Sequence, residues 1–197
     1  MKATWVVVLV KDFDTAKQRL GPVLAPGARR ALALENAERA IRAAAGFEHC
    51  LVVAGSEEAR QLADRLGTEV LLEAHPAGQN PAARAGIMHA QRAGATEVLV
   101  VSSDIPGVSA ASLQAVVEAA GTATRVVVAA AAVGRGGTNA LFLRPPGAID
   151  LHFGDDSLAK FERDARDRGV PFVVLEDTEL ALDLDEPSDL ALLEGSR

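Results

Sequence analysis

The sequence predicts an α/β domain with a mostly parallel central sheet and helices on both faces. Short apolar runs alternate with segments of helical character along the 197 residues, the order expected when a crossover helix follows each strand. The run Val-Leu-Val-Val at 98–101 has no polar alternation, which is typical of a central strand that is covered on both faces. No internal repeat and no long linker divides the chain, so we expect residues 1–197 to form a single domain.

The expected strands are short apolar runs bounded by glycine, proline or polar residues. In chain order they are residues 5–10, 50–54, 70–72, 98–101, 125–131, 139–143, 172–175 and 181–184. Only a glycine-rich loop separates strand 125–131 from strand 139–143, which is too short for a crossover helix. We therefore expect one of these two strands to run antiparallel to the rest of the sheet.

The expected helices are bounded by residues that favour helix ends. In chain order they are residues 26–45, 57–67, 81–93, 109–120, 157–168 and 187–193. Three of them begin with a proline in the first turn, where the missing N–H is not needed. Serines 56, 109 and 157 are the expected N-caps of the other three. Glycines follow four of the predicted ends, at positions 46, 67, 121 and 169.

Composition excludes several classes of function. A net charge of −7 argues against nucleic acid or an anionic membrane as the main partner, because both need a basic surface. The single cysteine, Cys50, excludes an internal disulfide and a thiolate metal cluster, and it fits a cytoplasmic location. The first apolar run, 5–10, is too short for a membrane span or a secretory signal. The chain also lacks a Walker loop, a Gly-x-Ser-x-Gly motif and a dinucleotide-binding fingerprint.

Three aspartates form a candidate magnesium site. Asp104 follows the central strand, and Pro106 prevents that strand from continuing, so the carboxylate stands where open α/β sheets bind ligands. Asp183 and Asp185 lie two residues apart at the end of an expected strand, and extended backbone would point both side chains to the same side. Mg²⁺ takes one or two carboxylates and fills its other positions with water and phosphate oxygens. The alternative is that Asp185 caps the last helix and Asp183 lies on the surface.

The loop after the first strand is a candidate anion site. It contains Lys11, Lys17 and Arg19, in a chain that has only four lysines. This concentration of positive charge beside the carboxyl end of a strand favours a phosphate ligand. A solvated loop whose charges only maintain solubility is the alternative, and the residues alone leave both open.

Two further segments offer backbone N–H groups to an anion. The stretch Gly-Gly-Thr-Asn at 136–139 has little side-chain bulk, and the stretch 153–157 precedes an expected helix N-terminus. A simple turn in the first stretch and an N-cap at Ser157 in the second are the alternatives. The histidines have no zinc-like spacing, so we expect structural or surface positions for all four.

Seven short motifs occur in an order that resembles one family of enzymes. They are Lys11, Lys17-Gln-Arg19-Leu20, Gly78-Gln-Asn80, Asp104-Ile-Pro106, Gly137-Thr-Asn-Ala-Leu141, Phe153-Gly-x-x-Ser157 and Leu182-Asp-Leu-Asp185-x-Pro187. The chain resembles, over nearly its full length, the phospholactate/phosphoenolpyruvate guanylyltransferases of deazaflavin (coenzyme F-420) biosynthesis. These belong to the nucleotidyltransferases similar to the molybdenum-cofactor guanylyltransferase. The Gly-Thr-Asn-Ala-Leu and Leu-Asp-x-Asp-x-Pro motifs are the most specific.

The resemblance implies a Rossmann-like, GT-A-like nucleotidyltransferase fold and a magnesium-dependent reaction. The phosphate of a small phosphorylated acid would attack the α-phosphorus of GTP and release pyrophosphate. By the resemblance, Asp104, Asp183 and Asp185 would hold Mg²⁺. The nucleotide would be bound by Lys11, Lys17, Arg19 and Asn80, with Lys17, Arg19 and Asp104 as the catalytic residues. The acid would be bound by Thr138, Gly154 and Ser157.

The sequence leaves the substrate open. 2-Phospho-L-lactate, phosphoenolpyruvate and 3-phosphoglycerate all fit the resemblance, because one or two contacts set such a choice. The chain departs from the family pattern at Gln79 and Gly107, where leucine is usual, and Asp155 adds a carboxylate beside the expected acid site. A nucleotidyltransferase with another nucleotide or a sugar-phosphate acceptor, and a non-catalytic nucleotide-binding protein, are the alternatives. A monomer and a homodimer are both compatible with the sequence.

Overall fold

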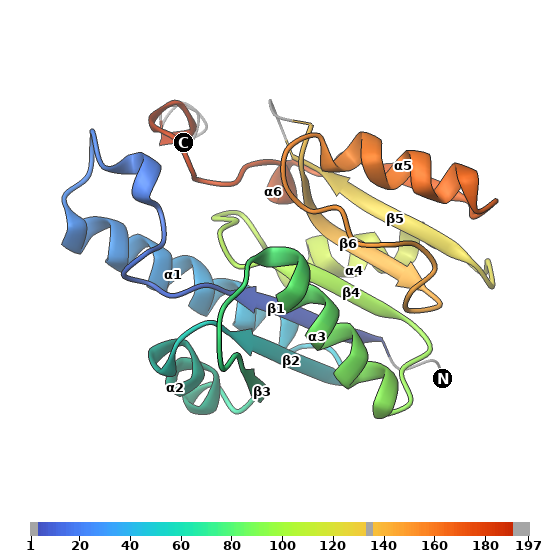
Figure 1. Ribbon diagram of the computed structural model, residues 1–197, viewed down its shortest axis with the longest axis horizontal. Helices are drawn as coiled ribbons and strands as arrows, with labels where there is room; N and C mark the ends of the chain where they lie inside the picture. Colours follow the sequence, from blue (N-terminus) through green and yellow to red (C-terminus); the bar gives the residue numbers. More distant parts are fainter. Residues whose placement is uncertain (1–3, 133–135, 191–197) are drawn as a thin grey trace.

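The computed structural model describes residues 4–132 and 136–190 and confirms the α/β prediction (Figure 1). Seven strands form one sheet in the order β3-β2-β1-β4-β6-β5-β7. Their bounds are β1 Trp5–Val10, β2 His49–Ala54, β3 Glu69–Leu72, β4 Val98–Ser102, β5 Val126–Ala131, β6 Thr138–Arg144 and β7 Phe172–Leu175. Strand β6 runs antiparallel to both β4 and β5, and the other pairings are parallel. The prediction of one antiparallel strand in this pair is therefore confirmed.

Helices α1 to α5 begin and end close to the predicted residues, whereas α6 was not predicted. Their bounds are α1 Pro26–Ala44, α2 Glu57–Arg65, α3 Gln79–Arg92, α4 Ala110–Ala119, α5 Ser157–Asp167 and α6 Thr178–Ala181, with a short 3₁₀ turn η1 at Gln18–Leu20. The Oγ of Ser56 accepts the N–H of Ala59, and Ser109 forms a capping box with Ser112, as the cap predictions require. No helix in the described part of the chain has the length and apolar character of a membrane span.

Helices cover both faces of the sheet (Figure 1). Alternate residues of each strand point to opposite faces, so Val6 and Val8 pack with α1, α2, α4 and α6, whereas Val7 packs with α3 and α5. Helix α3 approaches the sheet closely at Gly86, where a Cβ would lie 2.4 Å from a methyl group of Val7. Glycine is therefore required there, and it sets the position of the α3 N-terminus over the carboxyl end of β1.

Two predictions about the C-terminal third are wrong in detail. The predicted strand 181–184 is not a strand, because the Asp177 carboxylate accepts the N–H groups of Glu179 and Leu180 and starts helix α6. After α6 the chain is extended but does not join the sheet. Ser157 is the first residue of α5 rather than its N-cap, which is Asp156 in a left-handed conformation. The predicted last helix begins at residue 187, and its positions 191–193 lie outside the described residues.

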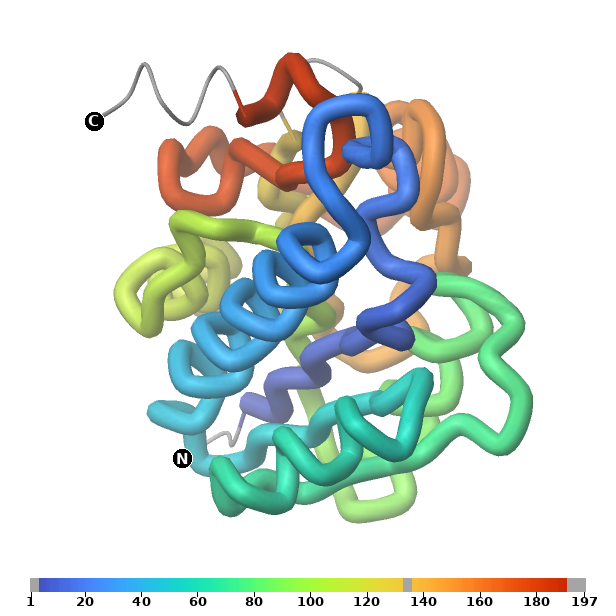
Figure 2. Tube along the Cα trace, turned by 90° about the vertical axis from the view of Figure 1, so that its left-hand side faces the viewer, coloured from blue at the N-terminus to red at the C-terminus, as the bar shows by residue number. Residues whose placement is uncertain are grey.

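The segment after α6 returns to the loop that follows β1. Figure 2 shows this segment and the loop before α1 at the same end of the molecule, and an ion pair joins Arg19 to Asp185. The backbone N–H of Leu184 donates to the carbonyl oxygen of Asp104, at 3.2 Å. Asp104 and Leu184, about 80 positions apart in the sequence, thus meet at the carboxyl end of β4. Arg19, from a third part of the chain, contacts the same segment.

Candidate active site

Two adjoining cavities lie at the carboxyl ends of the parallel strands. The β1 cavity, of about 190 Å³, is lined by the end of β1, the loop 11–17 and the residues that follow β2 and β3. The β6 cavity, of about 220 Å³, is lined by the start of β6, the loop before α5 and the segment after α6. Both cavities share Lys11, Gln79, Ser102, Asp104 and Asp185. Strand β6 is antiparallel to β4 and β5, so it begins at the edge of the sheet where those two strands end. The start of β6 therefore lies beside the ends of the parallel strands, and the two cavities adjoin there.

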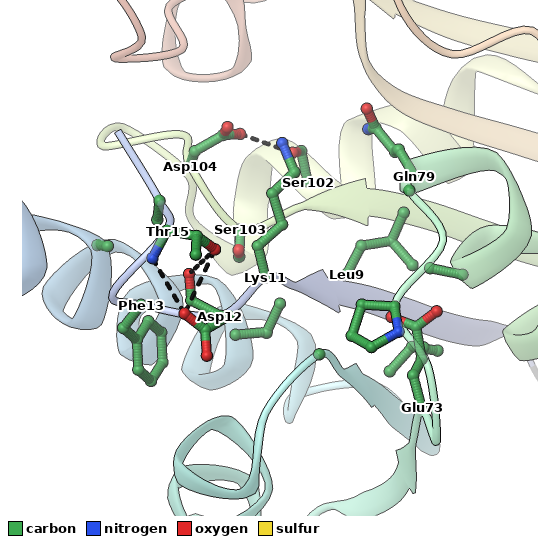
Figure 3. Close-up of a pocket in the computed structure, with 18 of the residues that line it drawn as sticks. Leu9, Lys11, Asp12, Phe13, Thr15, Glu73, Gln79, Ser102, Ser103 and Asp104 are labelled. Atoms are coloured by element: carbon green, nitrogen blue, oxygen red, sulfur yellow. Dashed lines mark hydrogen bonds between the residues drawn. The ribbon is translucent and has the colours of Figure 1, made fainter. Parts of the chain in front are cut away.

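Asp104 lines both cavities. Figure 3 shows its carboxylate beside the Ser102 side chain. Its Oδ1 accepts a hydrogen bond from Ser102 Oγ at 2.6 Å, and its Oδ2 lies 3.4 Å from Lys17 Nζ. Burial by itself would raise the pKa of Asp104, but Lys17, Lys11 and the Ser102 hydroxyl outweigh it and lower the pKa to about 2. A negative charge is therefore held at the carboxyl end of the central strand at neutral pH.

Lys17 is a buried cation with unused hydrogen-bonding capacity. Only 3% of its side chain is exposed, and its Nζ makes no hydrogen bond to any described residue besides the 3.4 Å ion pair with Asp104. Its backbone is left-handed, with φ at 58°, a conformation that is uncommon for residues other than glycine. A buried ammonium group normally has hydrogen-bond partners. Because Lys17 lines the β1 cavity, phosphate oxygens bound there could accept its N–H groups.

Asp183 and Asp185 line the β6 cavity together with Asp104, although they do not come from a strand. The side-chain amide of Asn139 donates to the carbonyl oxygen of Leu180 at 2.7 Å and fixes the chain just before this segment. Asp185 pairs with Arg19, with 3.1 Å between NH1 and Oδ2. The three predicted carboxylates thus share one cavity, which Lys11 and Arg19 also line.

The three carboxylates line one cavity but form no metal site by themselves. Within the described residues, no three carboxylate, imidazole or thiol groups are close enough to hold a metal ion by themselves. The carboxylates that line the β6 cavity are oxygen ligands only, which suits a hard cation. Mg²⁺ binds through a few carboxylates plus phosphate oxygens and water, so the arrangement fits the prediction, and the metal role stays a prediction.

Thr138, Gly154 and Ser157 come together on the other side of the β6 cavity. The Ser157 hydroxyl donates to Thr138 Oγ1 at 3.1 Å, and both side chains are buried. The N–H of Leu158 donates to the carbonyl oxygen of Gly136, which ties the start of α5 to the glycine loop before β6. Two hydroxyl groups at a helix N-terminus form a surface that can bind a phosphate or a carboxylate.

The structure gives Asn80 a different contact from the one predicted. Its Nδ2 donates to the carbonyl oxygen of Phe153 at 2.9 Å, and its Oδ1 accepts the N–H of Phe153 at 2.8 Å. Asn80 lines neither cavity, whereas its neighbour Gln79 lines both. Asn80 therefore positions the loop 153–157, and a contact with the nucleotide stays a prediction.

Gly107 and Asn139 position the site through contacts that the sequence did not predict. A Cβ on Gly107 would lie 2.7 Å from the carbonyl oxygen of Glu179, so glycine is needed for α6 to pack against the loop after β4. This contact explains the departure from leucine at that position. Asn139 supports the segment before Asp183, as described above. The Gly-Thr-Asn motif was the available signal for Asn139, but its side-chain partner is a backbone atom 41 residues away.

For the two substrates that the resemblance implies, we expect Asn80→Ala to raise the KM for the phosphorylated acid roughly tenfold, with a smaller effect on the KM for GTP. The substitution removes both hydrogen bonds to Phe153, each worth about 1 kcal/mol, so the loop 153–157 loses its fixed position. Steady-state kinetics with each substrate varied in turn will measure the effect. Asn36→Ala is the matched control, because Asn36 is a buried asparagine on α1 outside both cavities. Equal KM values for the acid in wild type and Asn80→Ala would contradict the positioning role.

Comparison with known proteins identifies the family. Residues 4–196 match the family model described as "Guanylyl transferase CofC like". The phosphoenolpyruvate guanylyltransferase of Rubrobacter xylanophilus is 38% identical, over 98% of this chain and 95% of the relative. The 2-phospho-L-lactate guanylyltransferase of Methanothermobacter thermautotrophicus is 33% identical, over 95% of this chain and 82% of the relative.

A solved structure with low sequence identity shares the fold. It is a protein from Desulfovibrio desulfuricans G20 assigned to the nucleotide-diphospho-sugar transferases. The TM-score is 0.80 at 16% identity, and the similarity covers 98% of this chain and 87% of that one. At this identity the likeness supports the nucleotidyltransferase fold predicted from the sequence.

Proposed function

The chain belongs to the CofC-like guanylyl transferases, and on this premise we propose that it joins GMP from GTP to a small phosphorylated carboxylic acid and releases pyrophosphate. One observation carries the proposal: ionised Asp104, paired with buried Lys17, stands where the two cavities meet. The arrangement provides one space for a nucleotide, a second space for an acceptor, and a charged boundary between them. It supports a transfer between two bound phosphates.

The β1 cavity is the proposed nucleotide site, and the β6 cavity is the proposed acid site. Lys17 and Lys11 line the β1 cavity and would donate hydrogen bonds to the triphosphate. Arg19 lines the β6 cavity, so it would reach the phosphates from the acid side. The hydroxyl groups of Thr138 and Ser157, with the backbone of Gly154, would hold the phosphorylated acid. Mg²⁺ held by Asp104, Asp183 and Asp185 would neutralise part of the negative charge of the two substrates.

The reaction needs correct positioning of the two substrates, and it needs no covalent intermediate with the protein. An oxygen of the acid's phosphate forms a bond to the α-phosphorus of GTP, and the bond from that phosphorus to the bridging oxygen of the β-phosphate breaks. The electron pair leaves with pyrophosphate. The attacking phosphate is already ionised, so no general base is required, and the protein contributes in-line orientation and charge neutralisation.

Phosphoenolpyruvate is the acid we expect to be used best. Relatives named for phosphoenolpyruvate are 30–38% identical to this chain, three of them at 36–38%, compared with 33% for a relative named for 2-phospho-L-lactate. The product would be a guanosine diphosphate diester of the acid, which we place in cytoplasmic deazaflavin (coenzyme F-420) biosynthesis. The family resemblance and the single cysteine support that placement.

Mass spectrometry of the products tests the proposal. The protein is incubated with GTP and Mg²⁺, and with phosphoenolpyruvate, 2-phospho-L-lactate, 3-phosphoglycerate or a sugar phosphate in parallel. We expect the mass of GMP joined to phosphoenolpyruvate, with one pyrophosphate released for each product molecule, and no product without an acid. Coupling to the sugar phosphate alone would support a different nucleotidyltransferase. If no pyrophosphate is released from GTP with any of these acceptors, the protein would instead be a non-catalytic nucleotide-binding protein.

A further inference from the structure

Glu73 is a carboxylate in the β1 cavity that the proposed reaction does not use. It directly follows β3, and its backbone N–H donates to the carbonyl oxygen of Ala54 at 2.9 Å, so its position is fixed by the sheet. Its side chain is half-buried, and none of the described residues pairs with the carboxylate. Burial raises the pKa of Glu73 because no partner compensates for the lost water. A ligand that donates hydrogen bonds to this carboxylate would replace the water that burial removes.

Glu73 and Asp104 lie on opposite sides of the β1 cavity, with Lys11 and Leu9 between them in Figure 3. The cationic side next to Asp104 is the proposed triphosphate site, so the side at Glu73 is left for the nucleoside. The lining of the β1 cavity also includes Leu9, Val53, Pro76 and Ala82, whose apolar surfaces suit the faces of a flat aromatic ring. Apolar lining residues, together with a carboxylate that has no partner among the described residues, suit a base with N–H donors on its edge.

We propose that Glu73 reads the base of the bound nucleotide and selects guanine, by accepting its ring N1–H and its exocyclic amino group on the two carboxylate oxygens. An ionised carboxylate is an acceptor only, and it can accept two parallel N–H groups at once. The same edge of adenine presents an amino donor beside a ring nitrogen with a lone pair. That lone pair would face a carboxylate oxygen, so adenine is disfavoured by repulsion as well as by a lost hydrogen bond. The assignment rests on the proposed function, in which the β1 cavity binds a nucleoside triphosphate.

Binding of GTP, ITP and ATP to wild type and Glu73→Gln tests the proposal, measured by isothermal titration calorimetry in the presence of Mg²⁺. ITP lacks the exocyclic amino group, so wild type should bind it roughly tenfold more weakly than GTP, and ATP more weakly still. Glutamine has nearly the same shape but presents one donor and one acceptor, which matches the edge of adenine. In Glu73→Gln we expect GTP affinity to fall roughly tenfold or more and the ratio of GTP to ATP affinity to shrink.

Glu48→Gln is the matched control, because Glu48 is exposed before β2, outside both cavities. Glu48→Gln should keep the wild-type ratio of GTP to ATP affinity. An unchanged ratio in Glu73→Gln, or equal binding of GTP and ITP by wild type, would overturn the assignment. An equal fall for all three nucleotides would place Glu73 at the ribose and would overturn it too.

The failure of this inference differs from the failure of the proposed function. If wild type couples GMP to an acid and Glu73→Gln keeps its base preference, the function stands and the base contact is wrong. If wild type prefers GTP through Glu73 but couples it to no acid, the base contact stands and the function is wrong.

Discussion

Asp104→Asn is expected to lower the kcat for product formation by roughly 10²- to 10³-fold, similar to the loss of one preorganised hydrogen-bond donor that stabilises a transition state. Asparagine keeps the volume of aspartate and an oxygen that can accept the Ser102 hydroxyl, so the fold should remain. The lost charge is the one that pairs with Lys17 and lines both cavities. Initial rates of pyrophosphate release with GTP and phosphoenolpyruvate measure the effect, with circular dichroism as the check on folding.

The matched control is Asp167→Asn, an exposed aspartate at the end of α5, which should keep the wild-type rate. A near-normal kcat in Asp104→Asn would remove Asp104 from the reaction centre. A loss of rate with a loss of secondary structure would instead show that Asp104 is needed for folding.

The same variant is expected to change the pH dependence of stability in the protein free of metal and nucleotide. The pKa of Asp104 is lowered from 3.8 to about 2 in the folded state, which corresponds to about 2 kcal/mol of stability near neutral pH. Because the folded-state pKa is the lower one, this contribution is complete above about pH 4 and is lost as the pH falls toward about 2. In urea unfolding, the difference between wild type and Asp104→Asn should therefore be smaller at about pH 3 than at about pH 6. A difference that does not depend on pH would contradict the ion pair with Lys17.

Lys17→Ala is expected to lower the kcat/KM for GTP by roughly 10²-fold or more, because a desolvated charge contributes more to binding than a hydrated one. The lysine is 3% exposed, and its ammonium group lies 3.4 Å from the Asp104 carboxylate, at the proposed triphosphate. Alanine keeps the same left-handed backbone requirement, so the comparison isolates the side chain. Kinetics with GTP varied at saturating acid measure the change.

Arg92→Ala is the charge-matched control, because Arg92 is an exposed cation at the end of α3, and its kcat/KM should equal that of wild type. An unchanged kcat/KM for GTP in Lys17→Ala would show that the loop 11–20 does not bind the nucleotide and is a solvated segment. An increase in the KM for the acid alone would place the lysine in the β6 cavity instead.

Much of the fold follows from local patterns in the sequence. The unbroken apolar runs of β1 and β4 predict buried parallel strands, because only a strand covered on both faces lacks polar alternation. The short glycine loop predicts the antiparallel pair of β5 and β6. The position of Asp104 follows as well, since the carboxyl ends of parallel strands meet at one edge of the sheet.

The rest depends on contacts between residues that are far apart in the sequence. The extended segment that carries Asp183 and Asp185 leaves the sheet, yet Asn139 and the carbonyl group of Asp104 hold it at the cavity. The burial of Lys17 and its ion pair with Asp104 join residues 87 positions apart, and no local pattern predicts them. Glu73 follows an ordinary edge strand, and only the fold shows that it lines a cavity without a partner among the described residues.

The most direct test of the account is the position of a divalent ion in a crystal grown with Mn²⁺, in place of Mg²⁺, and a non-hydrolysable GTP analogue. Anomalous scattering locates manganese without reference to the surrounding chain. The account predicts one peak bound by carboxylate oxygens of Asp104 and of the segment 183–185, with the triphosphate between that ion and Lys17. A peak elsewhere, with these carboxylates free of metal while the nucleotide is bound, would contradict it.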